Sequence, residues 1–460
     1  MKRKTKEKRL RGENKEKADE KKLEGQAKEN AEGQAEGLAE GDAGDKTGQG
    51  RVIDRKVLEA RRKQRIRRRR IIALIVLVLI IAAVIILLWR LGVFKKRDPD
   101  KVLTPSVTQV EYTPRGEYIM SAVDGTVVIC DENGVTGIDT DGKWKWNSTL
   151  SAFNPVFSGE GDVILVTDQG GKSIWAFNGS GQLWRYISEN DLICAYIAGP
   201  VSGSGGSSRS SENGPDIITI CEQEDFESSV TLLHTEKGKL VEKFTRKFGK
   251  YHMLSASESS DRSQLASAGV YYEGGVLTGC TVFLRTSDGE MYSTLVSDGE
   301  VYLQLRYLSD GTLFEANSDS LRLVRRTPSV SGSGDTEKVL WTRSGDRKLI
   351  VDTGVIGKDK FAAAFSDGNS SGGGMSYIKF YDRNGNVTKT SEILGSVKGM
   401  EILSGFLTVW TDKTVYLLNQ GGNIIGTSEF ESAISGASFM DTRTLAVNTA
   451  AGIFILSFSE

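Results

Sequence analysis

From about residue 105 onward, apolar and polar positions alternate in short runs that end at turn-forming residues. In TGIDTDGKWKW, residues 136 to 146, one such run leads into Asp139 and Gly142, and a second run follows with Trp144 and Trp146. A period of two places successive side chains on opposite faces of a strand. Asp initiates turns through its side chain and Gly permits a positive φ, so the segment predicts a β-hairpin.

Five further segments repeat this pattern. When all six are aligned on their turn glycines, an Asp, Asn or Thr stands three positions earlier and a β-branched residue stands seven positions earlier. The aligned pairs are Asp139 and Gly142, Asn178 and Gly181, Thr235 and Gly238, Thr286 and Gly289, Asp382 and Gly385, and Asn419 and Gly422. We expect the first residue of each pair to hydrogen-bond the backbone two positions on, so that six structural repeat turns share one geometry.

Two more strand-like runs precede each hairpin, which gives four strands per repeating unit. The units are 39 residues apart between Asp139 and Asn178, and 37 residues apart between Asp382 and Asn419. Four strands in a unit of about 40 residues are typical of a β-propeller blade. The predicted fold class is therefore all-β, with a β-propeller over residues 105–460. Eight four-stranded blades are preferred, and seven blades are the alternative.

The two ends of this region complement each other. The last unit ends at GIFILSF, residues 452 to 458, without a fourth strand, whereas SVTQVEY, residues 106 to 112, has no partner of its own. We expect residues 106 to 112 to supply the missing strand, because closing the ring removes exposed strand edges. In the first hairpin, alternation puts Trp144 and Trp146 on one face, and we expect both to pack between blades.

Residues 71 to 88 are eighteen consecutive apolar residues, IIALIVLVLIIAAVIILL. A helix of that length covers ~27 Å, close to the ~30 Å hydrocarbon core of a bilayer. We predict a transmembrane helix over residues 71–92, and an uncleaved signal anchor because no small-residue cleavage site follows it. Ten Lys and Arg lie in residues 55 to 70 and four in residues 90 to 97. The larger cluster favours a single-pass protein of the cell membrane with its N-terminus inside and its C-terminal domain extracytoplasmic.

The chain divides by composition and charge. Residues 1–50 are rich in Lys, Glu, Gly and Ala and predict a disordered cytoplasmic arm, followed by a basic juxtamembrane segment over 51–70. Residues 93–104 are expected to be a linker. Residues 98 to 460 contain 31 Lys and Arg and 46 Asp and Glu, a formal net charge of −15. Such a domain is not expected to bind nucleic acid, and it favours a basic protein or peptide over an anionic polymer.

The sequence contains no motif of a catalytic, cofactor or metal site. Asp139 and Asp141 are explained by their turn, and most positions equivalent to Asp139 are Asn or Thr, whereas calcium needs six to eight oxygen ligands. His234 and His252 are the only histidines, and both are interpreted as structural. We therefore expect no catalytic residues, no cofactor and no metal.

The four cysteines lie in apolar stretches and form no C-x-x-C pair. Cys130, Cys194, Cys221 and Cys280 are therefore interpreted as small buried residues. Cys194 and Cys221 fall on neighbouring predicted strands, so a disulfide between them stays open.

The pattern of Asp139, Gly142 and Trp146, D-x-x-G-x-x-x-W, resembles the repeat of pyrroloquinoline-quinone-type propellers, as does the N-x-x-G-x-x-W of residues 178 to 184. That superfamily includes eight-bladed quinoprotein dehydrogenases and non-enzymatic envelope scaffolds. The dehydrogenases often have a vicinal cysteine pair, which this chain lacks. The layout of charged arm, single anchor and outer propeller also resembles a family of Gram-positive envelope proteins of unknown function.

These observations predict a membrane-anchored extracytoplasmic propeller that binds an envelope protein or peptide partner without catalysis. The alternative is an enzyme or small-ligand sensor related to the same propellers, with a site in the central funnel.

Overall fold

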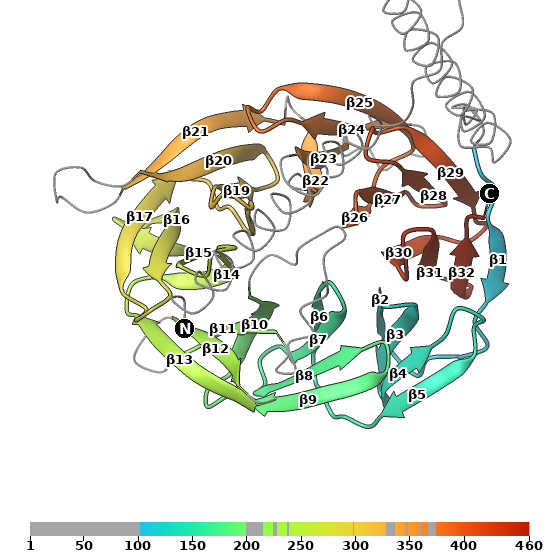
Figure 1. Cartoon of the computed structure of the whole chain (residues 1–460), viewed down its shortest axis with the longest axis horizontal. Coiled ribbons are helices and arrows are strands. Elements are labelled where there is room, and N and C mark those ends of the chain that lie inside the picture. Colours follow the sequence, from blue (N-terminus) through green and yellow to red (C-terminus); the bar gives the residue numbers. More distant parts are fainter. Residues whose placement is uncertain are drawn as a thin grey trace, which may run out of the picture. The chain divides into compact units, whose positions relative to one another are not determined.

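The described part of the chain is a closed ring of eight four-stranded antiparallel sheets (Figure 1). The structure is a computed structural model that describes residues 102–459 apart from 199–214, 224–227, 237–238, 298, 328–335, 346–347, 358–359 and 367–373. The chain divides into two units, Met1–Lys95 and Lys96–Glu460, and every described residue belongs to the second unit. The prediction of an all-β propeller with eight blades is confirmed, and the alternative of seven blades is wrong.

Each blade is a meander whose strands follow one another in the sheet, except in blade 8, where the outer strand comes from the start of the domain. Blades 1 to 4 contain β2 (Ile119–Val123), β3 (Thr126–Asp131), β4 (Gly134–Ile138) and β5 (Trp144–Ser148); β6 (Pro155–Glu160), β7 (Val163–Asp168), β8 (Ser173–Asn178) and β9 (Gly181–Ile187); β10 (Leu192–Ile197), β11 (Ile217–Cys221), β12 (Ser228–Glu236) and β13 (Lys239–Phe248); and β14 (His252–Glu258), β15 (Gln264–Glu273), β16 (Val276–Arg285) and β17 (Met291–Ser297). Blades 5 to 8 contain β18 (Gln304–Tyr307), β19 (Leu313–Ala316), β20 (Ser320–Thr327) and β21 (Thr336–Ser344); β22 (Leu349–Ile356), β23 (Lys360–Ser366), β24 (Met375–Tyr381) and β25 (Val387–Leu394); β26 (Gly399–Leu403), β27 (Phe406–Trp410), β28 (Thr414–Leu418) and β29 (Ile424–Glu429); and β30 (Ile434–Phe439), β31 (Thr444–Thr449), β32 (Gly452–Ser457) and β1 (Ser106–Gln109).

The start of the domain closes the ring. Strand β1 pairs with β32, with Ser106 opposite Ser457. Before β1, the backbone N–H of Leu103 donates to the carbonyl of Ile425 in blade 7 (2.8 Å), and after β1, Val110 N–H donates to Ile453 in blade 8 (2.9 Å). We call residues 102–112 the closing segment. The expected closure is confirmed, with the strand confined to residues 106 to 109.

A β-bulge marks the pairing of the third strand with the outer strand in every blade that forms this pair as a hairpin. The register shifts by one residue at this pair in blades 1 to 7. In blade 8, where β1 is not joined to β32 by a hairpin, the pairing of the described residues is continuous. The bulge therefore accompanies the hairpin turn, and it increases the local twist of the sheet there.

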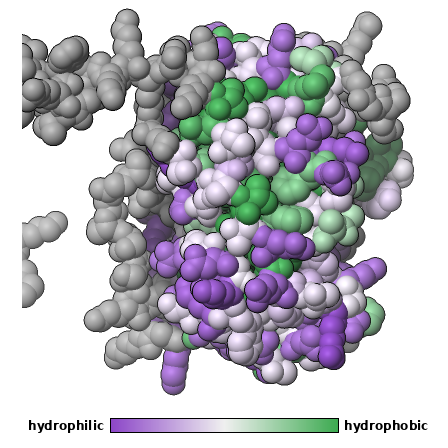
Figure 2. All heavy atoms as spheres, turned by 90° about the vertical axis from the view of Figure 1, so that its right-hand side faces the viewer, coloured by the Kyte–Doolittle hydropathy of each residue, from purple (hydrophilic) through white to green (hydrophobic). Residues whose placement is uncertain are grey.

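The core lies between the flat faces of neighbouring blades. Strands β3 and β4 are buried along their whole length, because blades 8 and 2 cover both faces of blade 1. Such strands show continuous apolar or β-branched runs, as in TVVIC and IITIC, in place of alternation. The outer strands are largely exposed, and the rim on the side of β1 shows apolar patches among hydrophilic side chains (Figure 2).

The cysteines of the described residues carry free thiols. Cys194 and Cys221 lie on the paired strands β10 and β11, but Cys194 is opposite Ile220 and Cys221 is opposite Leu192. The disulfide that the sequence left open is therefore not formed. Burial raises the pKa of the Cys194 thiol to about 12, so this group stays protonated and unreactive at neutral pH.

The predicted arm over 1–50, the juxtamembrane segment over 51–70, the transmembrane helix over 71–92 and the linker up to residue 101 lie outside the described residues. Within the described part, no helix has the length and apolar character needed to cross a membrane. The last residues of the linker, 102 to 104, belong to the closing segment.

Candidate functional site

Three of the structural repeat turns share one geometry. The side-chain oxygens of Asp139, Asp382 and Asn419 each accept hydrogen bonds from the backbone N–H groups two and four positions on, at 2.8 to 3.1 Å. The glycines that follow, Gly142, Gly385 and Gly422, have φ values of 79°, 74° and 76°. A side chain at such a φ strains the backbone, so these positions require glycine.

The other turns differ from this geometry. Asn178 accepts only from Ser180 N–H (2.8 Å) among the described residues, and Gly181 has a φ of 129°. The hydroxyls of Thr235 and Thr286 donate to the carbonyls of Pro215 and Arg262, in the neighbouring connection of the same blade. A shared geometry for all six turns is therefore not observed. In blade 4, the turn at Gly289 (φ 71°) is closed by a bond from Gly289 N–H to Arg285, and Gly238 lies outside the described residues.

The repeat turns also join neighbouring blades. The indole N–H of Trp146 in blade 1 donates to Gly179 in the turn of blade 2 (3.2 Å), and the indole N–H of Trp341 in blade 5 donates to Arg383 in the turn of blade 6 (3.1 Å). A Cβ at Gly385 would lie 2.8 Å from the Trp341 ring. The turns of blades 2 and 6 therefore help to join neighbouring blades.

Trp144 departs from its expected place. Trp146 packs between blades 1 and 2, where the absence of a side chain at Gly137 makes room for its ring. Trp144 is 67% exposed. The bulge at Lys145 lies between the two tryptophans, with Trp144 opposite Ile138 and Trp146 opposite Gly137. The expectation that both pack between blades is therefore wrong for Trp144.

Side chains of the inner strands bind the backbone of the next blade. The carboxylate of Asp352 on β22 accepts from Met400 N–H on β26 (3.0 Å), and that of Glu401 on β26 accepts from Phe439 N–H on β30 (3.3 Å). Burial raises the pKa of both groups, to about 7 for Glu401. The acidic groups at the centre are thus engaged in joining blades 6, 7 and 8.

A second polar cluster surrounds His234. Its Nδ1 lies 2.7 Å from Asp216 Oδ1, and Arg262 lies 3.0 Å from the other oxygen of this buried carboxylate. Glu258 is buried nearby, and burial raises its pKa to about 7. Across the described residues, no group of three or more His, Cys, Asp or Glu side chains is arranged to hold a metal ion.

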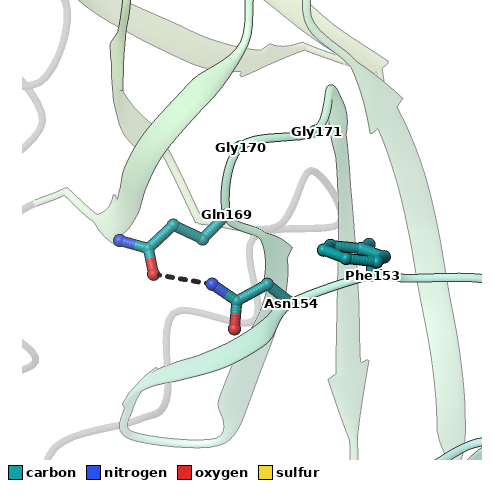
Figure 3. Close-up of a pocket in the computed structure, with 5 residues that line it drawn as sticks. All are labelled: Phe153, Asn154, Gln169, Gly170 and Gly171. Atoms are coloured by element: carbon teal, nitrogen blue, oxygen red, sulfur yellow. Dashed lines mark hydrogen bonds between the residues drawn. The ribbon is translucent and has the colours of Figure 1, made fainter.

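A cleft of about 430 Å³ opens where blade 1 connects to blade 2 (Figure 3). It is lined by the β5–β6 connection, with Phe153 and Asn154, and by the β7–β8 turn, with Gln169, Gly170 and Gly171. Successive connections of an antiparallel meander alternate between the two ends of its strands. The cleft therefore lies on the face of the propeller opposite the repeat turns.

The backbone around this cleft is held on several sides. Asp168 Oδ1 accepts from the N–H groups of Phe153 (2.8 Å) and Asn154 (3.1 Å), and Gln169 N–H donates to Asn154 (2.9 Å). Gly170 N–H donates to Leu192 of blade 3 (2.8 Å). The Phe153 side chain is nevertheless 97% exposed, and its ring projects away from the hydrogen-bonded carboxamides of Asn154 and Gln169 (Figure 3).

The charges near the cleft are mostly negative. Asp168 holds the backbone beside it, and Glu189 and Asp191 precede β10. The Lys172 ammonium donates to the Glu189 carbonyl (2.8 Å) and lies 3.9 Å from the Asp191 carboxylate. The three acidic residues outnumber the single lysine in these connections, so the surface is electrostatically suited to a cationic group.

The alternation of apolar and polar residues does not single out Phe153, which stands two residues before a strand. Strand β6 begins only at Pro155. The dipeptide Asn154-Pro155 is the signal in the sequence, since Asn-Pro favours a turn and Pro within a sheet is often the first residue of its strand.

The sequence pattern that defines a family of unknown function, DUF5711, matches residues 105–453. The chain belongs to this family. The matched range coincides with the propeller, from the closing segment to β32. No protein with a curated description matches the chain by sequence.

Several solved structures are similar to the propeller. The C-terminal WD40 domain of Sif2 has a TM-score of 0.50 at 12% identity, over 78% of this chain and 99% of that chain. Sqt1 from Chaetomium thermophilum has a TM-score of 0.50 at 10% identity, over 78% and 100%. BamB from Moraxella catarrhalis has a TM-score of 0.42 at 13% identity, over 78% and 100%. At these identities the likeness concerns the fold alone.

Proposed function

We propose that this chain is a membrane-anchored extracytoplasmic binding module, whose propeller holds a basic protein or peptide of the cell envelope at the Phe153 cleft. The observation that carries the proposal is a fully exposed aromatic ring on a backbone that is fixed at both sides. A fixed backbone that presents an apolar ring beside polar carboxamides favours the binding of a partner.

An exposed aromatic side chain on a fixed backbone is suited to anchor a partner. Exposed phenyl surface is unfavourable in water, and its burial against a partner contributes about 1.5 to 3 kcal/mol. Because the Asp168 carboxylate accepts hydrogen bonds from the backbone N–H groups of Phe153 and Asn154, this loop loses little conformational entropy when a partner binds. Residues that dominate the binding energy of protein interfaces are often aromatic side chains of this kind, buried on binding and held in place beforehand. The nearby backbone and carboxamides of Asn154 and Gln169 supply polar groups that orient a peptide.

Charge indicates the kind of partner. The connections around the cleft contain Asp168, Glu189 and Asp191 but a single Lys172, in a domain of net charge −15 over residues 98 to 460. Complementary charge raises association rates and excludes acidic partners. A Lys- or Arg-rich segment with an apolar residue for Phe153 therefore fits this surface.

The anchor is proposed from the sequence. The apolar run at 71 to 88 and the basic residues at 55 to 70 support a single span with the N-terminus in the cytoplasm. Protease added to intact protoplasts is expected to remove the propeller and to spare an epitope at the N-terminus. Loss of the epitope with survival of the propeller would show the opposite orientation.

Site-specific photocrosslinking on intact cells tests the partner site. A photoreactive phenylalanine analogue at position 153 is expected to capture one basic envelope protein or peptide. The same analogue at Tyr272, an exposed aromatic of blade 4, is the control and should not capture it. Phe153→Ala should reduce recovery of the partner about tenfold, equivalent to ~1.4 kcal/mol. Equal capture from both positions, or none from position 153, would overturn the proposal.

A further inference from the structure

A second concave surface lies on the rim, where the closing segment meets blade 1. This groove measures about 740 Å³ and lies between Glu111 and Tyr112 of the closing segment and the β4–β5 hairpin of blade 1. The two walls are close neighbours, because a Cβ at Gly142 would lie 3.2 Å from the carbonyl of Gln109. The groove is separate from the Phe153 cleft, and the proposed envelope partner does not involve it.

We propose that this groove binds a neutral saccharide chain. An exposed tryptophan, fixed aromatic and carboxamide neighbours, and balanced charge together favour this class of ligand.

The aromatic group is Trp144, whose side chain is 67% exposed and lines the groove. Trp144 does not contribute to packing between blades 1 and 2, because Trp146 fills that space. The flat, electron-rich face of an indole attracts the weakly positive C–H groups on one face of a sugar ring. A large aromatic side chain in a concave surface with few polar groups is typical of a ligand site.

The polar groups of the groove are held in place from below. The buried Asp131 carboxylate accepts from the Tyr112 hydroxyl (2.7 Å) and from the backbone N–H groups of Arg115 (2.9 Å) and Asn133 (2.8 Å). These bonds fix the Tyr112 ring and the loop that carries the Asn133 side chain. The groove is therefore preorganised, which reduces the entropy lost when a ligand binds.

Two carboxamides face this space with hydrogen-bonding capacity. Asn147 donates through Nδ2 to Thr136 Oγ1 (3.0 Å), which orients its amide, and both Asn133 and Asn147 are exposed. A carboxamide both donates and accepts, so each matches the paired donor and acceptor character of sugar hydroxyl and acetamido groups. The donor and acceptor groups of Asn133 and Asn147 that face the groove can therefore bind the hydroxyl or acetamido groups of a saccharide.

The charges in the groove balance. Among the residues that line it, Glu111 is the only acid and Lys143 the only base. A charged ligand, such as a nucleic acid, an anionic polymer or a strongly basic peptide, needs a groove with an excess of the opposite charge. Only then are its counterions and its hydration replaced. A neutral ligand needs no such excess of charge. The balanced charge of the groove therefore distinguishes it from the acidic Phe153 cleft.

Calorimetric titration of the purified full-length chain tests the proposal, with cellohexaose and chitohexaose as neutral saccharide probes and a blocked neutral hexapeptide as the alternative ligand. At least one saccharide is expected to bind with a dissociation constant of millimolar or tighter. Trp144→Ala should weaken binding at least tenfold, and Trp144→Phe, which keeps a flat ring, should recover much of it. Asn147→Asp, which adds a charge at nearly constant shape, should weaken binding several-fold.

Phe153→Ala is the matched control, because it removes an exposed aromatic from the other site and should change saccharide affinity less than twofold. The unfolding midpoint of Trp144→Ala should equal that of the wild type, which separates lost binding from lost folding. Absence of binding by both saccharides would overturn the proposal, as would equal affinity of Trp144→Ala and wild type. Trp144-dependent binding of the hexapeptide alone would also overturn it, and none of these outcomes bears on crosslinking at Phe153.

Discussion

The indole ring of Trp146 stacks on the phenyl ring of Phe177, with centroids 5.6 Å apart and planes within 4° of parallel. Trp146 belongs to the outer strand of blade 1 and Phe177 to the third strand of blade 2, so the contact joins two blades. The same indole donates its N–H to Gly179 at 3.2 Å. One side chain thus combines apolar burial with a hydrogen bond across the blade interface.

Two tryptophans two positions apart should therefore differ in their effect on stability. Trp146→Ala leaves a cavity and removes one of the two hydrogen bonds to the Gly179 carbonyl, and we expect it to lower the free energy of unfolding by ~3 to 5 kcal/mol. Trp144→Ala removes an exposed ring and should change it by less than ~0.5 kcal/mol. Denaturant titration of both variants measures the difference. Similar losses would show that Trp144 has a structural role that its exposure does not reveal.

The hairpin that contains these residues shows what the sequence predicts well. Asp139 and Gly142 act within five residues of chain, so their turn follows from local hydrogen bonding and backbone sterics alone. Repetition of that local pattern, together with the unpaired run at residues 106 to 112, was sufficient to predict eight blades and a ring closed by the start of the domain. Local hydrogen bonding and backbone sterics do not determine which side chains pack between the blades after the turn.

The places of Trp144, Thr235 and Phe153 depend on such longer-range features. The bulge at Lys145 separates Trp144 from the face of Trp146, and the Thr235 hydroxyl bonds Pro215, twenty positions earlier. Phe153 is exposed because Asp168, fifteen positions later, fixes its backbone. The rim groove combines the closing segment with blade 1. Periodicity within one strand carries no information on these contacts.

Gly385 permits the left-handed backbone of its turn and leaves space for the Trp341 ring of the neighbouring blade. A comparison with Gly311 separates these two effects on stability. Both have a left-handed φ, 74° and 79°, but a Cβ at Gly311 would meet nothing within 4 Å, whereas one at Gly385 would lie 2.8 Å from the rigid Trp341 ring. Gly311→Ala should cost ~1 to 2 kcal/mol from backbone strain alone. Gly385→Ala should cost at least ~1 kcal/mol more from overpacking.

Chemical denaturation of the two glycine variants gives this comparison directly. A larger loss for Gly311→Ala than for Gly385→Ala would contradict the assigned contact between the blade 6 turn and Trp341. A combined variant, Gly385→Ala with Trp341→Ala, should recover the overpacking part of the loss, because the two residues are in contact and their effects do not add.

A buried ion pair connects blades 4 and 5. Glu315 and Arg322 of blade 5 are paired and almost fully buried, and they also bond Thr281 (2.6 Å) and Ser297 (2.5 Å) of blade 4. Glu315→Gln leaves the guanidinium without its counter-charge and should lower the free energy of unfolding by ~3 to 5 kcal/mol. Replacing both residues, by Glu315→Leu with Arg322→Met, should cost less than that single change. A purely additive double variant would show that the pair does not act as a unit.

Glu401 should make the stability of the propeller depend on pH. Burial raises the pKa of this carboxyl to about 7 in the folded chain, and the nearby Asp352 acts in the same direction, whereas the ordinary value is 4.5. Between about pH 4.5 and about 7 the folded state therefore binds more protons than the unfolded state. Stability must fall as the pH rises through this window, with a slope of up to ~1.4 kcal/mol per pH unit from this group.

Glu401→Gln removes the titrating group while the side-chain oxygen can still accept from Phe439 N–H. We expect the variant to lose less stability than the wild type between about pH 4.5 and about 7, with the slope reduced but not abolished, because Glu258 titrates in the same window. Glu431→Gln, at an exposed position, is the control and should leave the pH profile unchanged. Unfolding free energies measured across the window decide the matter. Parallel profiles for Glu401→Gln and wild type would show that Glu401 takes up no extra proton on folding in this window, and would contradict the raised pKa of Glu401.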